Sequence, residues 1–318
     1  MALRLACTPG DPRGIGPEVA LEARTRFLDG HRSAEVVLYG PDGPMGADAL
    51  LEYAREARAG SRGDAHAASG AFAAEAIECA VRDALDGSLH GIVTAPLHKP
   101  SLHASGRVYP GQTEMLAALS DTEAVGMMMA AEQTRLDSPL RVVLATTHLP
   151  LSEVPEAVTR ELLVEQLMLT DRALRTDWGM ATPRLGLCAL NPHASDDGLL
   201  GDEEARVFRP AAAAARDLGA TVDGPLPADT VFGRALTGEF DAVVAPYHDV
   251  GMAAFKTVSF GSGVNVTLGL PFIRTSPDHG TAFDIAGTGA ADASSMCEAL
   301  KLASRLAKSR FDTPSPDV

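Results

Sequence analysis

Short apolar runs alternate along this chain with longer stretches that have helical periodicity. The apolar runs, each of a length that suits one strand, are residues 3–7, 35–39, 91–94, 141–147, 184–190 and 241–246. The helical patterns between them cover residues 17–27, 71–85, 160–174 and 203–218. Parallel neighbouring strands need a crossover connection, which is usually a helix. The alternation therefore predicts an α/β fold with mostly parallel sheets.

The length of the chain predicts more than one folding unit. At 318 residues the expectation is about two domains or subdomains. The sequence contains no internal repeat and no long linker, so two units would be interwoven rather than joined in series. Residues 59–70 are rich in Gly, Ala and Ser and are predicted to form a surface loop.

Charge and cysteine usage exclude several classes of protein. With 27 Lys and Arg against 42 Asp and Glu, the formal net charge is −15, and we find no basic patch for nucleic acid or an anionic membrane. No apolar run approaches the ~18 residues of a membrane span, and the N-terminal region lacks a signal-peptide pattern. The cysteines, Cys7, Cys79, Cys188 and Cys297, form no CxxC pair. Neither a disulfide framework nor a zinc knuckle is expected, and we predict a cytoplasmic location.

Four of the predicted strands are followed by a histidine: His98, His148, His193 and His248. In open α/β sheets, ligands bind at the carboxyl ends of the strands. Three neutral imidazoles can hold a divalent metal and leave positions open for a substrate. All-nitrogen ligation suits zinc, cobalt, nickel or iron better than calcium. Asp249 either orients the imidazole of a metal ligand by a hydrogen bond or faces water at the end of its strand.

A second group of polar residues lies in the apolar, Gly-rich segment 255–276. It consists of Lys256, Asn265 and Arg274. In a chain of strongly negative net charge, these residues predict recognition of a phosphate or carboxylate. The alternative is that the two cations cover the surface with their aliphatic stems.

Two Gly-rich segments are candidates for a nucleotide site. Residues 14–20 imitate the dinucleotide-binding fingerprint, but Val19 stands where a third small residue belongs. The second predicted strand also ends at Tyr39 without the acidic residue that would confirm the fingerprint. We therefore predict a tight turn and a helix start there. Residues 279–289 are small enough to let the backbone approach a flat or anionic ligand.

Several motifs in order along nearly the whole chain resemble one family. They lie at residues 10–18, 94–99, 145–151, 190–194, 224–230, 247–249, 263–276 and 278–282. Together they resemble the 4-hydroxythreonine-4-phosphate dehydrogenase family of pyridoxal phosphate biosynthesis. Residues 279–289 also resemble the adenine-side NAD loop of the isopropylmalate and isocitrate dehydrogenases, which form the wider fold group.

The resemblance implies a fold as well as an activity. Residues 1–318 would be a single family unit of two interwoven α/β/α subdomains with a cleft between them, like isopropylmalate dehydrogenase. The first subdomain, on the NAD side, would cover about residues 1–120 and 275–318. The second, on the metal and dimerisation side, would cover about 121–274. The family is a homodimer with its site at the subunit interface.

The resemblance also assigns roles to residues. The metal ligands would be His148, His193 and His248. The substrate-binding residues would be Gln112, Thr113, Lys256, Asn265 and Arg274. The cofactor-binding residues would be His279, Gly280, Thr281, Ala282 and Asp284. For proton transfer we predict Asp229 with Lys256 or Lys99. The family usually has His where this chain has Gln112, and Gln can neither become cationic nor act as a base.

These residues predict oxidation of a phosphorylated hydroxy acid by NAD or NADP, with Zn, Co or Mg bound, followed by decarboxylation. The expected substrate is 4-hydroxythreonine 4-phosphate. Because of Gln112, threonate or erythronate 4-phosphate and a dihydrodiol dicarboxylate remain alternatives. A three-histidine metal hydrolase or lyase is the alternative from another class, and it would have no need of residues 279–289. A catalytically silent sugar-phosphate binding protein is a third. Residues 133–139 resemble an insertion, for which the sequence predicts no function.

Overall fold

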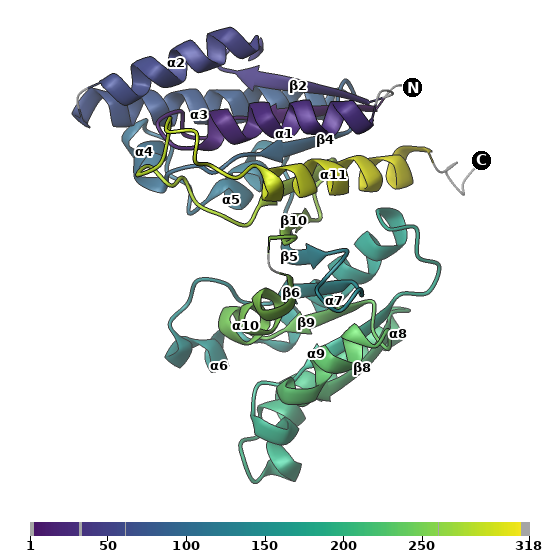
Figure 1. The fold of residues 1–318 in the computed structure, drawn as a ribbon. Helices are drawn as coiled ribbons and strands as arrows, with labels where there is room; N and C mark the ends of the chain where they lie inside the picture. The colour runs from purple at the N-terminus through teal and green to yellow at the C-terminus, as the bar shows by residue number, and fades with distance from the viewer. Residues whose placement is uncertain (1–2, 32–33, 61, 260, 313–318) are drawn as a thin grey trace. The chain divides into compact units, whose positions relative to one another are not determined.

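The predicted apolar runs form strands that are flanked by helices, so the α/β prediction is confirmed (Figure 1). The computed structural model describes residues 3–31, 34–60, 62–259 and 261–312. Contacts divide the chain into two compact units. Unit 1 is Met1–Glu123 with Leu270–Val318, and unit 2 is Ala124–Gly269.

Unit 1 contains a sheet in which four parallel strands lie in the order β2-β1-β4-β11. The strands are β1 (Leu3–Thr8), β2 (Ala34–Gly40), β4 (Gly91–Thr94) and β11 (Ile273–Pro277). A two-residue strand, β3 (Gly43–Pro44), pairs antiparallel with β2. In the register of the sheet, Leu5 stands opposite Val36 on one side and Gly91 on the other. The chain segment after residue 269 thus returns to pair with β4.

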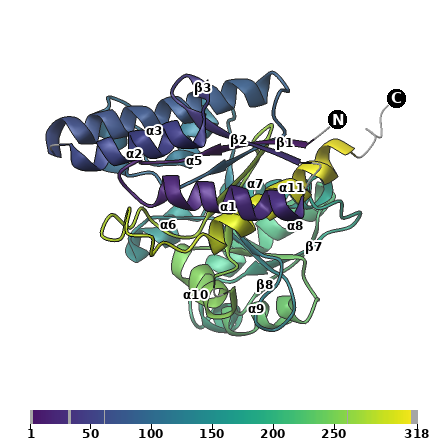
Figure 2. The same ribbon diagram turned by 45° about the horizontal axis from the view of Figure 1, so that its top comes forward.

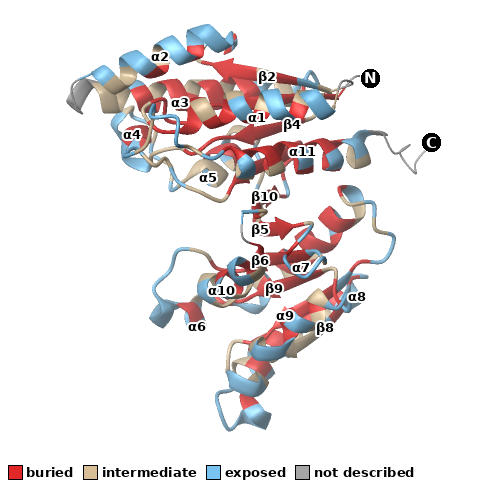
Figure 3. Cartoon of the chain, viewed as in Figure 1, coloured by how far each residue is buried: buried red, intermediate tan, exposed pale blue. Residues whose placement is uncertain are grey.

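Helices cover both faces of the unit 1 sheet (Figures 1 and 2). The helices are α1 (Gly16–Gly30), α2 (Ala47–Ala59), α3 (Arg62–Leu85), α4 (Lys99–Ala104), α5 (Gln112–Leu119) and α11 (Ser294–Asp312). Helices α1 and α11 pack side by side, and α3 packs against β1, β2 and β4. Strand β4 is buried at every position, as its continuous apolar pattern requires (Figure 3).

The prediction of a surface loop over residues 59–70 is wrong. Helix α2 ends at Ala59 and α3 already begins at Arg62. Alanine has the highest helix propensity, which favours a helix in this Ala-rich stretch despite its glycines. Gly70 lies inside α3, and no side chain fits at this position because a Cβ there would stand 1.8 Å from the Ser101 carbonyl oxygen. The glycine thus marks a close contact between α3 and α4 rather than a loop.

Unit 2 contains a mixed sheet in the order β10-β5-β6-β9-β7-β8. The strands are β5 (Gly126–Ala131), β6 (Leu140–Leu144), β7 (Arg184–Cys188), β8 (Thr221–Leu226), β9 (Ala242–Ala245) and β10 (Val264–Leu268). Strand β5 pairs antiparallel with β6 and β10, whereas β6, β9, β7 and β8 are mutually parallel. The segment 133–139 forms the turn between β5 and β6, closed by the Thr134 amide donating to the Ser138 carbonyl at 3.1 Å.

The helices of unit 2 also cover both faces of their sheet. They are α6 (Val154–Ala157), α7 (Arg160–Thr176), α8 (Arg209–Asp217), α9 (Ala228–Leu236) and α10 (His248–Ser259). Two 3₁₀ segments, η1 (Leu151–Glu153) and η2 (Pro192–Gly198), and a π-helical turn, η3 (Glu204–Phe208), complete the unit. Val231 of α9 and Phe255 of α10 pack with Val142 and Val243 of the sheet in one apolar core. The helix predicted over residues 203–218 forms as η3 followed directly by α8.

The cysteines are buried and unpaired, as the lack of CxxC pairs predicts. Burial raises the pKa of the Cys7 and Cys188 thiols to about 12. These two thiols are therefore inert at neutral pH. Within the described residues, no helix combines the length and apolar character needed to cross a membrane.

Gly70→Ala tests the packing of α3 on α4. Since the added Cβ meets backbone, we expect a loss of about 1–3 kcal/mol in the free energy of unfolding, measured by urea denaturation. Gly233→Ala in α9 is the matched control because a Cβ there meets nothing within 4 Å. That variant should be stabilised by about 0.5–1 kcal/mol. Equal effects of the two substitutions would contradict the packing argument.

Candidate active site

The carboxyl ends of β4 and β11 open onto a cavity of about 190 Å³ in unit 1. Its lining comprises Thr94, Ala95, Pro96, Leu97, Gln112, Ser276, Pro277, His279 and Gly280. Parallel pairing of β4 with β11 places Arg274 opposite Ile92. The Arg274 Nη2 donates to Thr94 Oγ1 at 2.8 Å and to Gln112 Oε1 at 3.4 Å. Residues from three separate segments of the sequence thus meet at one edge of this sheet.

Arg274 is a buried cation that donates hydrogen bonds to two residues of the cavity lining. The residue is 3% exposed. Burial lowers the pKa of its guanidinium to about 10, partly offset by the Glu114 carboxylate. The group therefore stays protonated at neutral pH, in surroundings where an anion would interact with it more strongly than in water. Its two hydrogen-bond partners in the cavity lining, Thr94 and Gln112, are neutral acceptors.

Gln112 is fixed at the start of α5. Its Nε2 donates to the Ala95 carbonyl at 3.1 Å, which turns its Oε1 toward Arg274. Thr113 follows it in the first turn and is half-buried. Lys99 is exposed at the start of α4, and its Cε stands 3.8 Å from where a Cβ of Gly111 would be. Lys99 thus lies beside the residue that precedes Gln112.

A polar network that sequence reasoning missed holds His98 near the same edge. Asp11, which is 1% exposed, accepts two hydrogen bonds from the Arg13 guanidinium, at 3.1 and 2.8 Å. Arg13 Nη2 also donates to Ser101 Oγ at 2.5 Å, and Ser101 Oγ lies 2.7 Å from His98 Nδ1. Burial lowers the pKa of His98, with Arg13 adding to the effect and Asp11 opposing it. The charged form of the imidazole is thereby disfavoured.

The segment 279–289 packs against the first Gly-rich segment of the chain. Thr281 accepts a hydrogen bond from the Ile15 amide at 2.9 Å, and a Cβ on Gly14 would stand 2.6 Å from the Thr281 carbonyl oxygen. The predicted helix start is confirmed, since α1 begins at Gly16. Phe283 contacts the His98 ring edge-on at a centroid distance of 5.0 Å.

The predicted cofactor residues differ in their surroundings. His279 and Gly280 line the cavity, and the His279 Nε2 is buried without a hydrogen-bond partner. Ala282 has a φ of 41° and Asp284 is exposed. A buried polar atom without a partner is uncommon and marks His279 as a candidate ligand contact.

In unit 2, two of the predicted metal ligands lie together. His148 follows β6 and His248 follows β9, and these parallel neighbours bring the two rings to a centroid distance of 5.7 Å. His248 Nδ1 lies 2.7 Å from Asp249 Oδ1. A carboxylate there fixes the tautomer with the proton on Nδ1, so that Nε2 keeps its lone pair. Asp249 thus contacts an imidazole while its own side chain is 88% exposed to water, so each of the two interpretations that the sequence left open has a feature in its favour.

His193 follows β7, on the other side of β9. In the part of the chain that the structure describes, no three His, Cys, Asp or Glu residues are grouped closely enough to hold a metal. The single chain therefore brings together His148 and His248 and does not bring His193 into a group of three.

The turn that carries His193 has an unusual backbone. Five consecutive residues other than glycine, His193 to Asp197, have φ values from 44° to 74°. This left-handed region costs a residue with a Cβ roughly 1–2 kcal/mol. The turn therefore needs tertiary contacts that hold it, and such strain is typical of functional sites.

The remaining predicted residues of unit 2 lie on α9, α10 and β10. Asp229 is exposed in the first turn of α9, and Lys256 is exposed on α10. Asn265 stands opposite Met129 in the pairing of β10 with β5, and its Oδ1 is buried without a hydrogen-bond partner.

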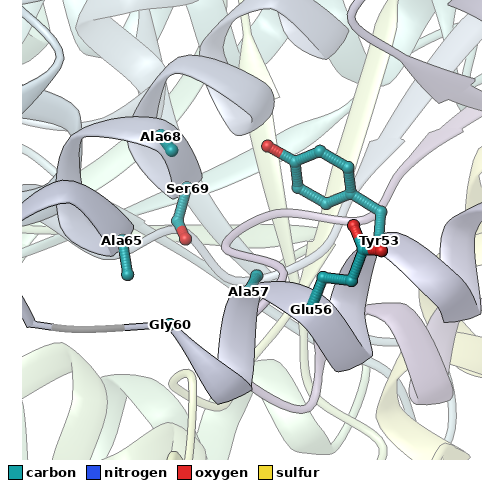
Figure 4. A pocket seen from close by; sticks show the side chains of 7 residues that line it. All are labelled: Tyr53, Glu56, Ala57, Gly60, Ala65, Ala68 and Ser69. Atoms are coloured by element: carbon teal, nitrogen blue, oxygen red, sulfur yellow. The ribbon is translucent and has the colours of Figure 1, made fainter.

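A second cavity in unit 1, of about 370 Å³, lies between α2 and α3 (Figure 4). Tyr53 and Glu56 line it from α2, and Ser69 lines it from α3. The Ser69 hydroxyl is buried without a hydrogen-bond partner. None of the residues that the sequence predicts for the site lines this cavity.

Arg274→Met tests the anion site of unit 1. Loss of charge-assisted hydrogen bonds, which contribute about 1.5–3 kcal/mol, should weaken the binding of inorganic phosphate at least about 10-fold in isothermal titration calorimetry. Arg55→Met, on an exposed face of α2, is the control and should bind phosphate like the unsubstituted protein. Unchanged affinity in Arg274→Met would show that phosphate does not use this cavity.

Known proteins are similar to this chain over most of its length. The family profile described as "Pyridoxal phosphate biosynthetic protein PdxA" matches residues 32–303. The curated 4-hydroxythreonine-4-phosphate dehydrogenase of Paracoccus denitrificans is 44% identical over 95% of this chain and 97% of its own length. The crystal structure of the 4-hydroxythreonine-4-phosphate dehydrogenase from Klebsiella pneumoniae has a TM-score of 0.80 and 36% identity, over 96% of this chain and 98% of that one.

A structure with lower sequence identity to this chain is named for a different dehydrogenase activity. It is a terephthalate 1,2-cis-dihydrodiol dehydrogenase from Burkholderia xenovorans, with a TM-score of 0.65 and 28% identity, over 96% of this chain and 98% of that one. The family profile covers most of the chain, and the curated relative is similar over nearly its whole length. The chain therefore belongs to the 4-hydroxythreonine-4-phosphate dehydrogenase family, a family of oxidoreductases.

Proposed function

We propose that this protein oxidises the secondary alcohol of 4-hydroxythreonine 4-phosphate with NAD or NADP, in vitamin B6 synthesis. The observation that carries the proposal is the buried cation Arg274, which donates hydrogen bonds to Thr94 and Gln112 of the unit 1 cavity lining. A phosphorylated hydroxy acid provides the anion that such a cation binds. The names of relatives similar over the whole chain support the same substrate.

The histidines fit a divalent metal. His148 and His248 supply two imidazoles, and Asp249 leaves the Nε2 of His248 available for ligation. We propose His193 as the third ligand, contributed across a homodimer interface, and Zn, Co or Mg as the metal. A bound cation would supply Lewis acidity toward the alcohol and the new carbonyl. Imidazoles bound in this way must be neutral, so metal affinity should fall at acidic pH.

For the nicotinamide cofactor we propose residues 279–289. His279 Nε2 offers an unpartnered polar atom at the cavity, and Gly280 lets a ligand approach the backbone there. Thr281, Ala282 and Asp284 continue the same segment. This segment favours a dehydrogenase over a three-histidine hydrolase or lyase, which needs no nicotinamide. A nicotinamide held there would supply the hydride acceptor for oxidation of the alcohol.

The protein's own groups bind the substrate and transfer its protons. Arg274 binds an anionic group of the substrate, and we propose Lys256 and Asn265 as further substrate-binding residues. Oxidation removes a hydride from carbon and a proton from the hydroxyl oxygen, and a β-keto acid then loses CO₂ and takes up a proton. We propose Asp229 with Lys256 or Lys99 as the groups that move these protons. Lys99 is exposed beside the start of α5 and is open to exchange with solvent.

Because residue 112 is Gln, related substrates remain candidates. It contacts Arg274 as a neutral acceptor and has no titratable proton to give to a substrate. Threonate or erythronate 4-phosphate would satisfy the same cation, and a dihydrodiol dicarboxylate would present a carboxylate instead. We also propose a cytoplasmic location, because the buried unpaired thiols suit a reducing compartment.

The substrate is tested by formation of reduced nicotinamide at 340 nm with Zn²⁺, Co²⁺ or Mg²⁺. The panel is 4-hydroxythreonine 4-phosphate, threonate 4-phosphate, erythronate 4-phosphate and a dihydrodiol dicarboxylate. We expect the highest kcat/KM for the first. Turnover of a sugar-acid phosphate alone would assign Gln112 to a changed specificity. Hydrolysis or elimination without nicotinamide reduction would favour the metal hydrolase or lyase.

Gln112→His tests what this position contributes. An imidazole can donate to the substrate and titrate near neutral pH, whereas the amide cannot. We expect the variant to raise kcat/KM for 4-hydroxythreonine 4-phosphate and to add a pH dependence near ~6.5, the usual pKa of His. Gln112→Asn, which keeps the amide, is the control and should add no such pH dependence. A flat pH profile in the His variant would show that residue 112 does not contact the reacting group.

A further inference from the structure

Glu204 is a buried carboxylate that the proposed chemistry does not use. It lies at the start of η3, is 0% exposed, and accepts four hydrogen bonds from the segment that carries His193. Its Oε1 accepts from the Leu190 amide at 2.9 Å and from the Asn191 amide at 2.7 Å. Its Oε2 accepts from Asn191 Nδ2 at 2.9 Å and from the Ser195 hydroxyl.

These four donors lie on both sides of His193. Leu190 and Asn191 precede it, and Ser195 follows it within the left-handed turn. One carboxylate thus fixes both ends of a five-residue segment, 191–195, in which the His193 side chain remains exposed. Burial by itself raises the pKa of Glu204, but hydrogen bonds from Asn191 and Ser195 outweigh it, so the pKa is lowered. All four partners therefore face a charged acceptor.

The neighbouring residues strengthen this arrangement. Glu203 Oε2 accepts a further hydrogen bond from Asn191 Nδ2 at 2.7 Å. Gly201, at a φ of 117°, lets the chain pass close by, because a Cβ there would stand 2.6 Å from Asn191 Nδ2 and 2.7 Å from Glu203 Oε2. The Asn191 side chain is thus enclosed by Gly201, Glu203 and Glu204.

We propose that Glu204 is a positioning residue that holds the strained left-handed turn and thereby sets the place of the His193 imidazole. The inference rests on the proposed function for the role of His193 as a metal ligand. A strained turn without a restraint relaxes toward ordinary φ values, which moves its side chains. A carboxylate suits the restraint because it has acceptor capacity for all four donors and presents no donor of its own.

Glu204→Gln tests the restraint with little change in shape. If the amide nitrogen takes the Oε2 position, it can donate to the Ser195 hydroxyl but meets the Asn191 Nδ2 donor, and at the Oε1 position it meets two backbone amides, so at least one hydrogen bond is lost. In hydrogen–deuterium exchange, the amides of residues 190–200 should exchange about 10- to 100-fold faster than in the unsubstituted protein. Glu203→Gln is the matched control, because Glu203 accepts a single described hydrogen bond, and it should change exchange little.

The consequence for His193 is measured with Co²⁺ alone as the probe. Visible absorption of the Co²⁺ complex, titrated against a chelator, gives the affinity and reports the ligand geometry. Glu204→Gln should bind Co²⁺ about 10- to 100-fold more weakly than the unsubstituted protein, as is typical when a ligand loses its supporting contact. Far-UV circular dichroism should be unchanged.

Ala194→Gly distinguishes positioning from a general structural role. Ala194 has a φ of 54°, which glycine adopts without strain. Added to Glu204→Gln, this substitution should restore part of the Co²⁺ affinity, because the turn then needs less restraint. Ala213→Gly, on the exposed side of the right-handed helix α8, is the same chemical change and should restore none.

The exchange and metal measurements separate the two proposals. If the unsubstituted protein bound no Co²⁺, the proposed metal site would be wrong, while faster exchange in Glu204→Gln would still show that Glu204 holds the turn. Unchanged exchange at residues 190–200 would overturn the inference whatever the metal result. Faster exchange with unchanged Co²⁺ affinity would overturn the positioning of His193.

Discussion

Parallel pairing of strands is the constraint on which both units depend. In unit 2, β6, β9, β7 and β8 run the same way, so their carboxyl ends share one edge. In unit 1, β1, β4 and β11 do the same. A residue that directly follows a strand is then carried to that edge, whatever its distance along the sequence. His148 and His248 are a hundred residues apart in the chain and neighbours in space for this reason.

Buried charge at these edges is stabilised by short polar networks. Asp11 is paired with Arg13, Arg274 is bonded to Thr94 and Gln112, and Glu204 takes up donors from the turn after β7. The Asp11 and Glu204 networks each restrain a loop, because moving the loop would leave a buried polar group without its partners. The strength of these networks comes from the low local dielectric, which makes both the hydrogen bonds and their loss more costly than in water.

The predicted strands and helices agree with the structure where the apolar pattern was continuous. Strand β4 has the predicted bounds, and β1, β2, β6, β7 and β9 lie within two or three residues of them. Strand β5, with its run Gly-Met-Met-Met-Ala-Ala, was missed because methionine and alanine carry little strand preference. The helix at residues 62–70 was missed because its glycines resemble a loop, although Gly70 is required by contact with Ser101.

The amino-acid sequence by itself determined the α/β class, the reduced cysteines and the histidines that follow the strands, because strand length, apolar pattern and residue order are local properties. Only the tertiary structure decided which of those histidines meet, and that Arg274 lies beside Gln112 at one cavity. It also decided that Glu204 binds the turn of His193, where five residues other than glycine take left-handed φ values. No local pattern encodes such a turn, because its conformation is unfavourable in isolation and is held by a carboxylate that comes later in the sequence.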